Sequence, residues 1–167
     1  HRNDLVTQVD RGVEERIARH LEDTGVPIHG EEAHRVEDFE TYRGRVWVLD
    51  PIDGTLNYVS THRDWAISLA LVDDGVPVVA VLADPGAGRL YTAVRGRGAR
   101  VEPLTEGAAG AVGAAPRVLE TVEDLPLSEG MVIAHYQLTQ DAGIGRAIEA
   151  SRGMRCYGAA ALEMTEV

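Results

Sequence analysis

Three consecutive strand-like runs in the middle of the chain most constrain its fold. Residues 65–73 and 76–84 are rich in apolar and β-branched residues, and Asp74-Gly75 between them is a strong signal for a tight hairpin turn. A third run, residues 89–94, follows a turn that contains proline and glycine. Because strands joined by short hairpins pair antiparallel, this region predicts an antiparallel sheet.

Helices and further strands are expected on both sides of this sheet. Residues 7–24 predict a helix, because Val13, Ile17 and Leu21 recur at four-residue spacing on one face. After the sheet, strands and helices alternate, which is an α/β pattern. The other expected elements are strands at 26–29, 45–50, 131–135 and 154–157, and helices after Thr55, over 144–151 and from Gly158.

The expected fold class is α/β, with a division into two lobes. Residues 1–104 form an α+β amino-terminal lobe that carries the chemistry-bearing motifs. Residues 105–116 are small and glycine-rich, as in a flexible linker or loop. Residues 117–167 begin an α/β carboxy-terminal lobe, and the last residues read as the middle of a helix.

Charge and cysteine content narrow the classes of partner. The chain has 16 arginines, no lysines and 27 acidic residues, for a net charge of −11. Such a surface repels nucleic acid and anionic lipid, so neither is an expected partner, and no stretch is apolar enough to span a membrane. The single cysteine, Cys156, predicts a buried structural thiol and a reducing, cytoplasmic location.

The densest chemical signal is the segment from Asp50 to Thr55, Asp-Pro-Ile-Asp-Gly-Thr. Two carboxylates three residues apart at a strand end repel each other unless a cation lies between them, and oxygen ligands select Mg²⁺, Ca²⁺ or Mn²⁺ over zinc. The N–H groups of Gly54 and Thr55, at a helix start, suit a phosphate. The alternative is that the segment contains only turn residues, that Glu31 and Glu32 are surface acids, and that Asp10 interacts with a helix dipole.

The chain resembles the inositol monophosphatase family in several segments that occur in the family's order. The match over 47–58 (Trp-Val-Leu-Asp-Pro-Ile-Asp-Gly-Thr-Leu-Asn-Tyr) resembles the family signature most closely. The other similar segments are 4–10 (Asp-Leu-Val-Thr-Gln-Val-Asp), 30–32 (Gly-Glu-Glu), 91–99 (Tyr-Thr-Ala-Val-Arg-Gly-Arg-Gly-Ala) and, more weakly, 158–162 (Gly-Ala-Ala-Ala-Leu). The resemblance covers nearly the whole chain and implies a layered α-β-α-β-α sandwich.

The resemblance implies roles for individual residues. Ligands of a first magnesium would be Glu31, Asp50 and the carbonyl of Ile52, and ligands of a second would be Asp50 and Asp53. Thr55, hydrogen-bonded towards Asp10, would help Glu31 to orient and deprotonate the attacking water. The N–H groups of Gly54 and Thr55 would bind phosphate. Substrate hydroxyls would contact Gly158, Ala159 and Ala160, although the family usually has serine or threonine where this chain has Ala159.

The function implied by the resemblance is a magnesium-dependent phosphomonoesterase, with Mn²⁺ as a substitute metal. It would hydrolyse inositol monophosphate or a related polyol or sugar phosphate by in-line attack of metal-activated water, would be sensitive to lithium, and would form a homodimer. The alternative is a weak or inactive family member that binds metal and phosphate and regulates a partner. The chain ends before the family's Trp-Asp metal motif, so a protein ending at Val167 is expected to bind one divalent ion and turn over substrate poorly.

Overall fold

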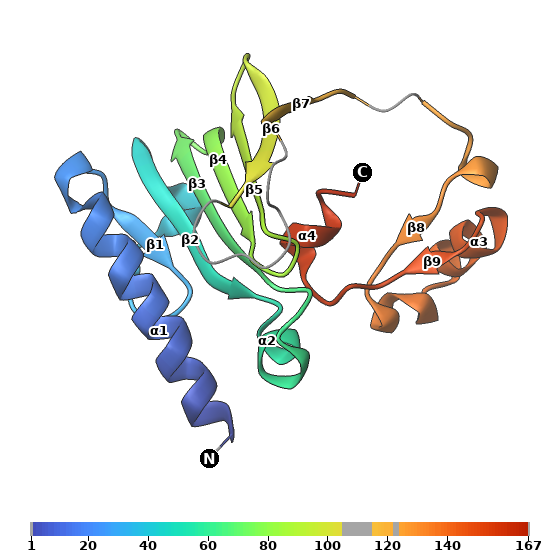
Figure 1. The fold of residues 1–167 in the computed structure, drawn as a ribbon, viewed down its shortest axis with the longest axis horizontal. Coiled ribbons are helices and arrows are strands. Elements are labelled where there is room, and N and C mark those ends of the chain that lie inside the picture. Colours follow the sequence, from blue (N-terminus) through green and yellow to red (C-terminus); the bar gives the residue numbers. More distant parts are fainter. Residues whose placement is uncertain (1, 105–114, 122–123, 167) are drawn as a thin grey trace.

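A seven-stranded mixed sheet forms the larger part of the computed structural model (Figure 1), which describes residues 2–104, 115–121 and 124–166 and side chains from residue 8 onwards. The strands follow one another in chain order; β1 is parallel to β2, and every later pair is antiparallel. Their bounds are β1 Ile28–Gly30, β2 Arg45–Asp53, β3 Ala66–Asp73, β4 Val76–Asp84, β5 Arg89–Val94, β6 Gly98–Pro103 and β7 Arg117–Leu119.

The hairpin at the centre of the sheet confirms the prediction from its turn residues. Asp73 pairs with Val76, so Asp74 and Gly75 form a two-residue turn. Both turn residues have positive φ, 48° and 78°, as the tight turns that match strand twist require. The antiparallel arrangement of β3, β4 and β5 follows from this turn and from the next one along the chain.

Helix α1 (Arg2–Leu21) lies alongside β1 and β2 in Figure 1 and contacts β2. It begins before residue 7, where the sequence pattern placed its start. Its buried positions are Asp10, Glu14 and Ala18, which are at most 5% exposed. The predicted helix is confirmed, but its apolar positions Val13, Ile17 and Leu21 are only half-buried. A polar face is buried because two of its carboxylates belong to the site described below.

A second, smaller sheet pairs β8 (Val132–Ile133) with β9 (Met154–Arg155) in parallel, and α3 (Ala142–Ala150) connects them. Helix α4 (Ala160–Glu163) contacts β3 and lies between the two sheets (Figure 1). Short helices complete the described structure: α2 Thr55–Thr61, η1 Glu22–Thr24, η2 Phe39–Thr41, η3 Leu127–Glu129 and η4 Tyr136–Gln140. The mixed α/β class is therefore confirmed.

Three details differ from the sequence expectations or lie beyond them. Residues 117–119, which were assigned to the second lobe, pair with β6 and so extend the first sheet. Most of the expected linker, residues 105–114, lies outside the described residues. Cys156 is exposed rather than buried. No helix in the described ranges combines the length and the apolar composition needed to cross a bilayer.

Candidate active site

A bulge near the end of β2 brings Asp50 and Asp53 together. Asp50 pairs with Ser68 and Asp53 pairs with Ala66, so β2 advances three residues while β3 advances two. In a regular strand, residues three apart point to opposite faces, and the extra residue changes that alternation. The buried residues Pro51 and Ile52 fix the backbone between the two carboxylates.

Asp50 lies in an environment that disfavours its ionised form. Burial, and then the negative charges of Glu31 and Asp53, raise the pKa of Asp50 to about 7. The N–H group of Ile52 donates a hydrogen bond to Oδ1 of Asp50 at 3.1 Å, which partly counteracts the rise in pKa. The negative charge of Glu31 therefore acts on Asp50, and the family resemblance assigns these two residues to a shared metal.

Asp10 faces the same group of acids from α1. Its side chain is buried, and its Oδ1 atom has no hydrogen-bond partner. Burial, and then the charges of Glu32 and Glu31, raise the pKa of Asp10 to about 6. A buried carboxylate oxygen without a donor is costly, so this position requires a proton, a water molecule or a cation to complete it.

The carboxylates fit a divalent cation by their chemistry. Burial and neighbouring negative charges raise the pKa of Asp10 and of Asp50, so both positions favour a nearby positive charge. Oxygen ligands are those that Mg²⁺ and Mn²⁺ prefer. Within the described ranges, no three His, Cys, Asp or Glu side chains converge closely enough to hold one ion between them. The site therefore has the charge that a metal needs, with the side chains further apart than direct ligation requires.

The turn after Asp53 has a conformation that suits glycine. Gly54 has a φ of 83°, and a Cβ atom added there would lie 2.9 Å from the Cβ of Ala159. Helix α2 begins at the next residue, Thr55. The hydroxyl of Thr55 donates to the carbonyl oxygen of Ile52 at 3.0 Å, rather than to Asp10 as expected. Thr55 thus orients a predicted metal-binding carbonyl.

The segment that follows β9 lies against this turn and includes Gly158, Ala159 and Ala160, for which the family resemblance implied substrate contacts. Asp53 accepts hydrogen bonds from the N–H groups of Ala160, at 3.2 Å, and Ala161, at 2.6 Å. Ala159 is buried against Ala66 and Leu162, so its side chain is part of the core. A serine or threonine at this position, as the family usually has, would therefore place its hydroxyl in the core and not on an open surface.

Three polar residues that sequence reasoning did not single out hold the site's backbone. Asn57 donates to the carbonyl oxygens of Asp64 and Tyr157, at 2.8 and 2.7 Å. Glu163 accepts hydrogen bonds from the N–H groups of Tyr157 and Gly158. Glu14 is fully buried beneath the Glu31–Glu32 turn. The one sequence signal for Glu14 is its four-residue spacing from Asp10 and from Ala18, which places the three residues on one face of the helix.

The pKa of Glu14 is lowered although Glu14 is buried. Burial by itself raises the pKa, but hydrogen bonds from the backbone of Glu32, the side chain of His34 and the backbone of His34 and Ala33 outweigh it. Glu14 is thus a carboxylate held ionised by donors, whereas Oδ1 of Asp10, one turn earlier, has no hydrogen-bond partner. The pKa values of these two neighbouring acids of α1 are therefore shifted in opposite directions.

A pocket of about 570 Å³ lies between the second sheet and α4. None of the predicted metal ligands lines it, and Ala160 is the only predicted site residue that does. The lining residues are Met131, Ile133, Arg155, Tyr157, Ala160, Glu163, Met164 and Glu166. The carboxylate group and this pocket are therefore neighbours on either side of one backbone segment.

Comparison with known protein families gives a match along the entire chain. The model of the "Inositol monophosphatase family" matches residues 1–167. Among curated proteins, an inositol-1-monophosphatase of Bacillus subtilis is 32% identical over 172 residues, which cover 99% of this chain and 60% of that protein. A histidinol-phosphatase of Mycobacterium tuberculosis is 43% identical over 96 residues, 56% of this chain and 36% of that protein.

Solved structures agree with this match. Inositol monophosphatase II of Staphylococcus aureus aligns with a TM-score of 0.81 and 33% identity, over 99% of this chain and 61% of that one. A structure of the S. aureus enzyme with bound inositol monophosphate aligns with a TM-score of 0.76 and 31% identity, over 99% of this chain and 61% of that one. The chain thus spans about 60% of the length of these relatives.

Proposed function

Because the chain belongs to the inositol monophosphatase family, we propose that it supplies the metal and phosphate site of a magnesium-dependent phosphomonoesterase. Its substrate would be inositol monophosphate or a related polyol or sugar phosphate. The observation that carries the proposal is Asp50, whose pKa is raised to about 7 by burial and by the charges of Glu31 and Asp53. The acids at the end of this strand would bind a cation, and the N–H groups of the neighbouring glycine turn would bind an anionic ligand beside it.

The proposed metal ligands are Glu31, Asp50, Asp53 and the carbonyl of Ile52. A bound Mg²⁺ would supply positive charge to the phosphate oxygens and make a bound water more acidic. The chain's own residues prepare the site for it: Thr55 orients the carbonyl of Ile52 through its hydroxyl, and the bulge sets Asp50 beside Asp53.

The proposed proton acceptor for the attacking water is Glu31, assisted by Asp10 and Thr55. Oδ1 of Asp10 has no partner, so it is free to accept a hydrogen bond from a water molecule near Glu31. The N–H groups of Gly54 and Thr55, at the start of α2, are proposed to bind the phosphate.

Substrate contacts are proposed for the backbone of Gly158, Ala159 and Ala160, because this segment adjoins the carboxylates. In this proposal, residues 1–104 carry the metal and phosphate site, β7 (Arg117–Leu119) belongs to the same sheet, and the residues after β7 begin the substrate lobe. The buried side chain of Ala159 leaves recognition to backbone groups and to the rest of the pocket. We further propose that the protein is a homodimer located in the cytoplasm.

The test is a panel of phosphate esters incubated with the full-length protein and Mg²⁺ or Mn²⁺, with release of inorganic phosphate as the readout. Inositol 1-phosphate is expected to be among the best substrates, and an Asp50→Asn variant is expected to be inactive. Preference for histidinol phosphate would assign the protein to a sister branch. Metal binding without turnover of any ester would instead support the binding or regulatory alternative.

A further inference from the structure

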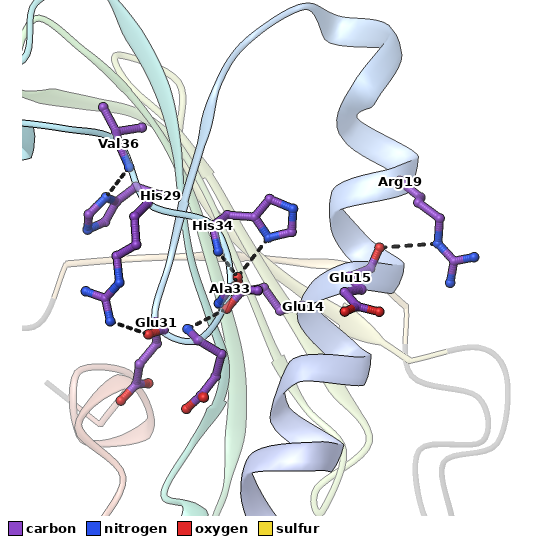
Figure 2. Close-up of polar contacts among 10 residues, drawn as sticks. Glu14, Glu15, Arg19, His29, Glu31, Ala33, His34 and Val36 are labelled. Atoms are coloured by element: carbon purple, nitrogen blue, oxygen red, sulfur yellow. Dashed lines mark hydrogen bonds and ion pairs between the residues drawn. The ribbon is translucent and has the colours of Figure 1, made fainter.

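A buried carboxylate on α1 holds the turn that carries Glu31 and Glu32. Oε2 of Glu14 accepts a hydrogen bond from the N–H group of Glu32 at 2.8 Å. Its Oε1 accepts from the N–H groups of Ala33, at 2.9 Å, and His34, at 2.7 Å. The ring Nδ1 of His34 donates to the same oxygen at 2.9 Å. Four donors from three consecutive residues thus converge on one side chain, and Figure 2 shows it reaching from α1 to Ala33 and His34.

The space around Glu14 is shaped for this carboxylate. The side chain of Glu14 is completely buried. A Cβ atom added to Gly30 would overlap the carboxylate, although the backbone of Gly30 does not have positive φ. Gly30 is therefore required by the Glu14 side chain and not by its own backbone. Burying a charge costs several kcal/mol, so a purely structural turn had cheaper solutions available.

The far end of the same loop is held separately. Nδ1 of His29 accepts a hydrogen bond from the N–H group of Val36 at 3.1 Å, and the His29 ring stacks on Phe39. The guanidinium of Arg35 donates to the carbonyl oxygen of Glu31. The two hydrogen bonds are drawn in Figure 2. The loop from Glu31 to Val36 is thus fixed at both ends, with the Glu31 and Glu32 side chains left to act on Asp50 and Asp10.

We propose that Glu14 is a positioning residue that fixes the turn Glu31–His34, so that the carboxylates of Glu31 and Glu32 are presented to the metal site. Glu14 itself would touch neither metal nor substrate, because its two oxygens are used by the turn. The inference rests on the proposed function, since it assumes that Glu31 binds the metal. It adds a residue on a different element that determines where Glu31 lies.

The first test is Glu14→Gln in the full-length protein, with calorimetric titration of Mn²⁺. Glutamine has one acceptor oxygen, so its NH₂ group would face the N–H group of Glu32 or those of Ala33 and His34. Loss of an outer-shell partner typically weakens metal binding by about 10–100-fold, and we expect the dissociation constant for Mn²⁺ to rise in that range. The matched control is Glu15→Gln, because Glu15 is exposed on the same turn of α1 (Figure 2) and is expected to leave the affinity unchanged.

A second variant reaches the same carboxylate from the other side. Gly30→Ala should displace Glu14 and reproduce its loss of Mn²⁺ affinity, whereas Gly12→Ala, which has open space on α1, should not. In a double-mutant cycle, Glu14→Ala with Gly30→Ala should bind Mn²⁺ no more weakly than Glu14→Ala alone, because the overlap is gone. Additive losses would overturn the proposal, since they would mean that Gly30 acts independently of Glu14.

Amide hydrogen exchange separates positioning from general destabilisation. In Glu14→Gln, exchange at Glu32, Ala33 and His34 should accelerate while amides of β3 and β4 stay protected. Acceleration throughout the sheet, or unchanged Mn²⁺ affinity in a folded Glu14→Gln variant, would overturn the proposal. Absence of Mn²⁺ binding by the unmodified protein would instead contradict the proposed function, so the two failures are distinguishable.

Discussion

The carboxylate of Asp53 accepts a hydrogen bond from the N–H group of Ala161 at 2.6 Å, across 108 positions of sequence. Its other oxygen accepts from Ala160. The acid proposed as a metal ligand on β2 therefore also joins the first sheet to the start of α4. Asp53 is consequently sensitive to change in two ways, through the charge of the site and through the contact between the two parts of the chain.

Replacing Asp53 by asparagine is expected to lower kcat of the full-length protein by a factor of about 10² or more, because one negative charge of the metal site is lost. It should also reduce the free energy of unfolding by about 1–3 kcal/mol, because the amide NH₂ faces a backbone N–H group. Phosphate release and urea unfolding measure the two effects. Asp141→Asn is the matched control, since asparagine also caps the start of α3 well. A variant within threefold of wild-type kcat would show that Asp53 is only a turn residue.

The metal-free protein is expected to lose stability as pH rises. The ordinary pKa of aspartate is 3.8, and the folded values are about 6 for Asp10 and about 7 for Asp50. Between these limits the folded state binds more protons than the unfolded state, so the free energy of unfolding falls from about pH 4 to pH 7. Melting temperatures across this range should show the decline, and saturating Mn²⁺ should remove it because the cation replaces the protons.

The control for this pH effect is Asp10→Asn, which should flatten part of the decline. At pH 8 it should stabilise the metal-free protein by about 1–3 kcal/mol, since an asparagine avoids ionisation of the buried side chain. Glu15→Gln, at an exposed position on the same helix, should leave the slope unchanged. Melting temperatures of Asp10→Asn that follow the wild-type slope would show that Asp10 ionises without cost.

Gly54→Ala is expected to cost more stability than Gly75→Ala. Both glycines have similar positive φ, 83° and 78°, so alanine meets the same backbone strain of about 1–2 kcal/mol. A Cβ at Gly54 would in addition press on Ala159 and on the carbonyl oxygen of Asp64, whereas Gly75 has open space. Urea unfolding of both variants gives the difference, which we expect to be about 1–3 kcal/mol. Equal losses of stability in the two variants would mean that Ala159 and α4 can shift away from the added Cβ atom at no cost.

Lithium is expected to inhibit the full-length enzyme uncompetitively at millimolar concentration. The family resemblance implies that Li⁺ would occupy the cation position beside Asp50 and Asp53 and would hold the phosphate product there. Initial rates at several substrate and Li⁺ concentrations measure the pattern, with Na⁺ at equal ionic strength as the control. Activity that Li⁺ does not change would mean that the protein belongs to a different branch of the superfamily, or that its second cation binds at a different site.

Local patterns predicted most of the strands, and the Asp74-Gly75 turn identified the hairpin. The expected grouping of Asp50 with Glu31 came from the family resemblance. The bulge could not be predicted, because it depends on which residues of β3 pair with Asp50 and Asp53. The spacing of Val13, Ile17 and Leu21 predicted the helix but not its buried face, because apolar periodicity does not detect buried acids that find donors on another element, as Glu14 does.

Other features depend on contacts between distant segments. Thr55 donates to Ile52, three residues away, and no local pattern distinguishes this acceptor from Asp10. The burial of Ala159 and the use of the Ala160 and Ala161 N–H groups by Asp53 arise only when α4 packs against the first sheet. Such contacts have no signal in local periodicity.

The bridge formed by Asn57 has a consequence for the order of folding. Its side chain joins the carbonyl oxygens of Asp64 and Tyr157, and the second of these contacts spans 100 residues. Contacts of such sequence separation close large loops, which slows their formation relative to the local hairpins of β3, β4 and β5. During synthesis the central sheet can therefore form while Asp53 still lacks its α4 donors. Catalytic competence would then be acquired late, as a step separate from the collapse of the central sheet.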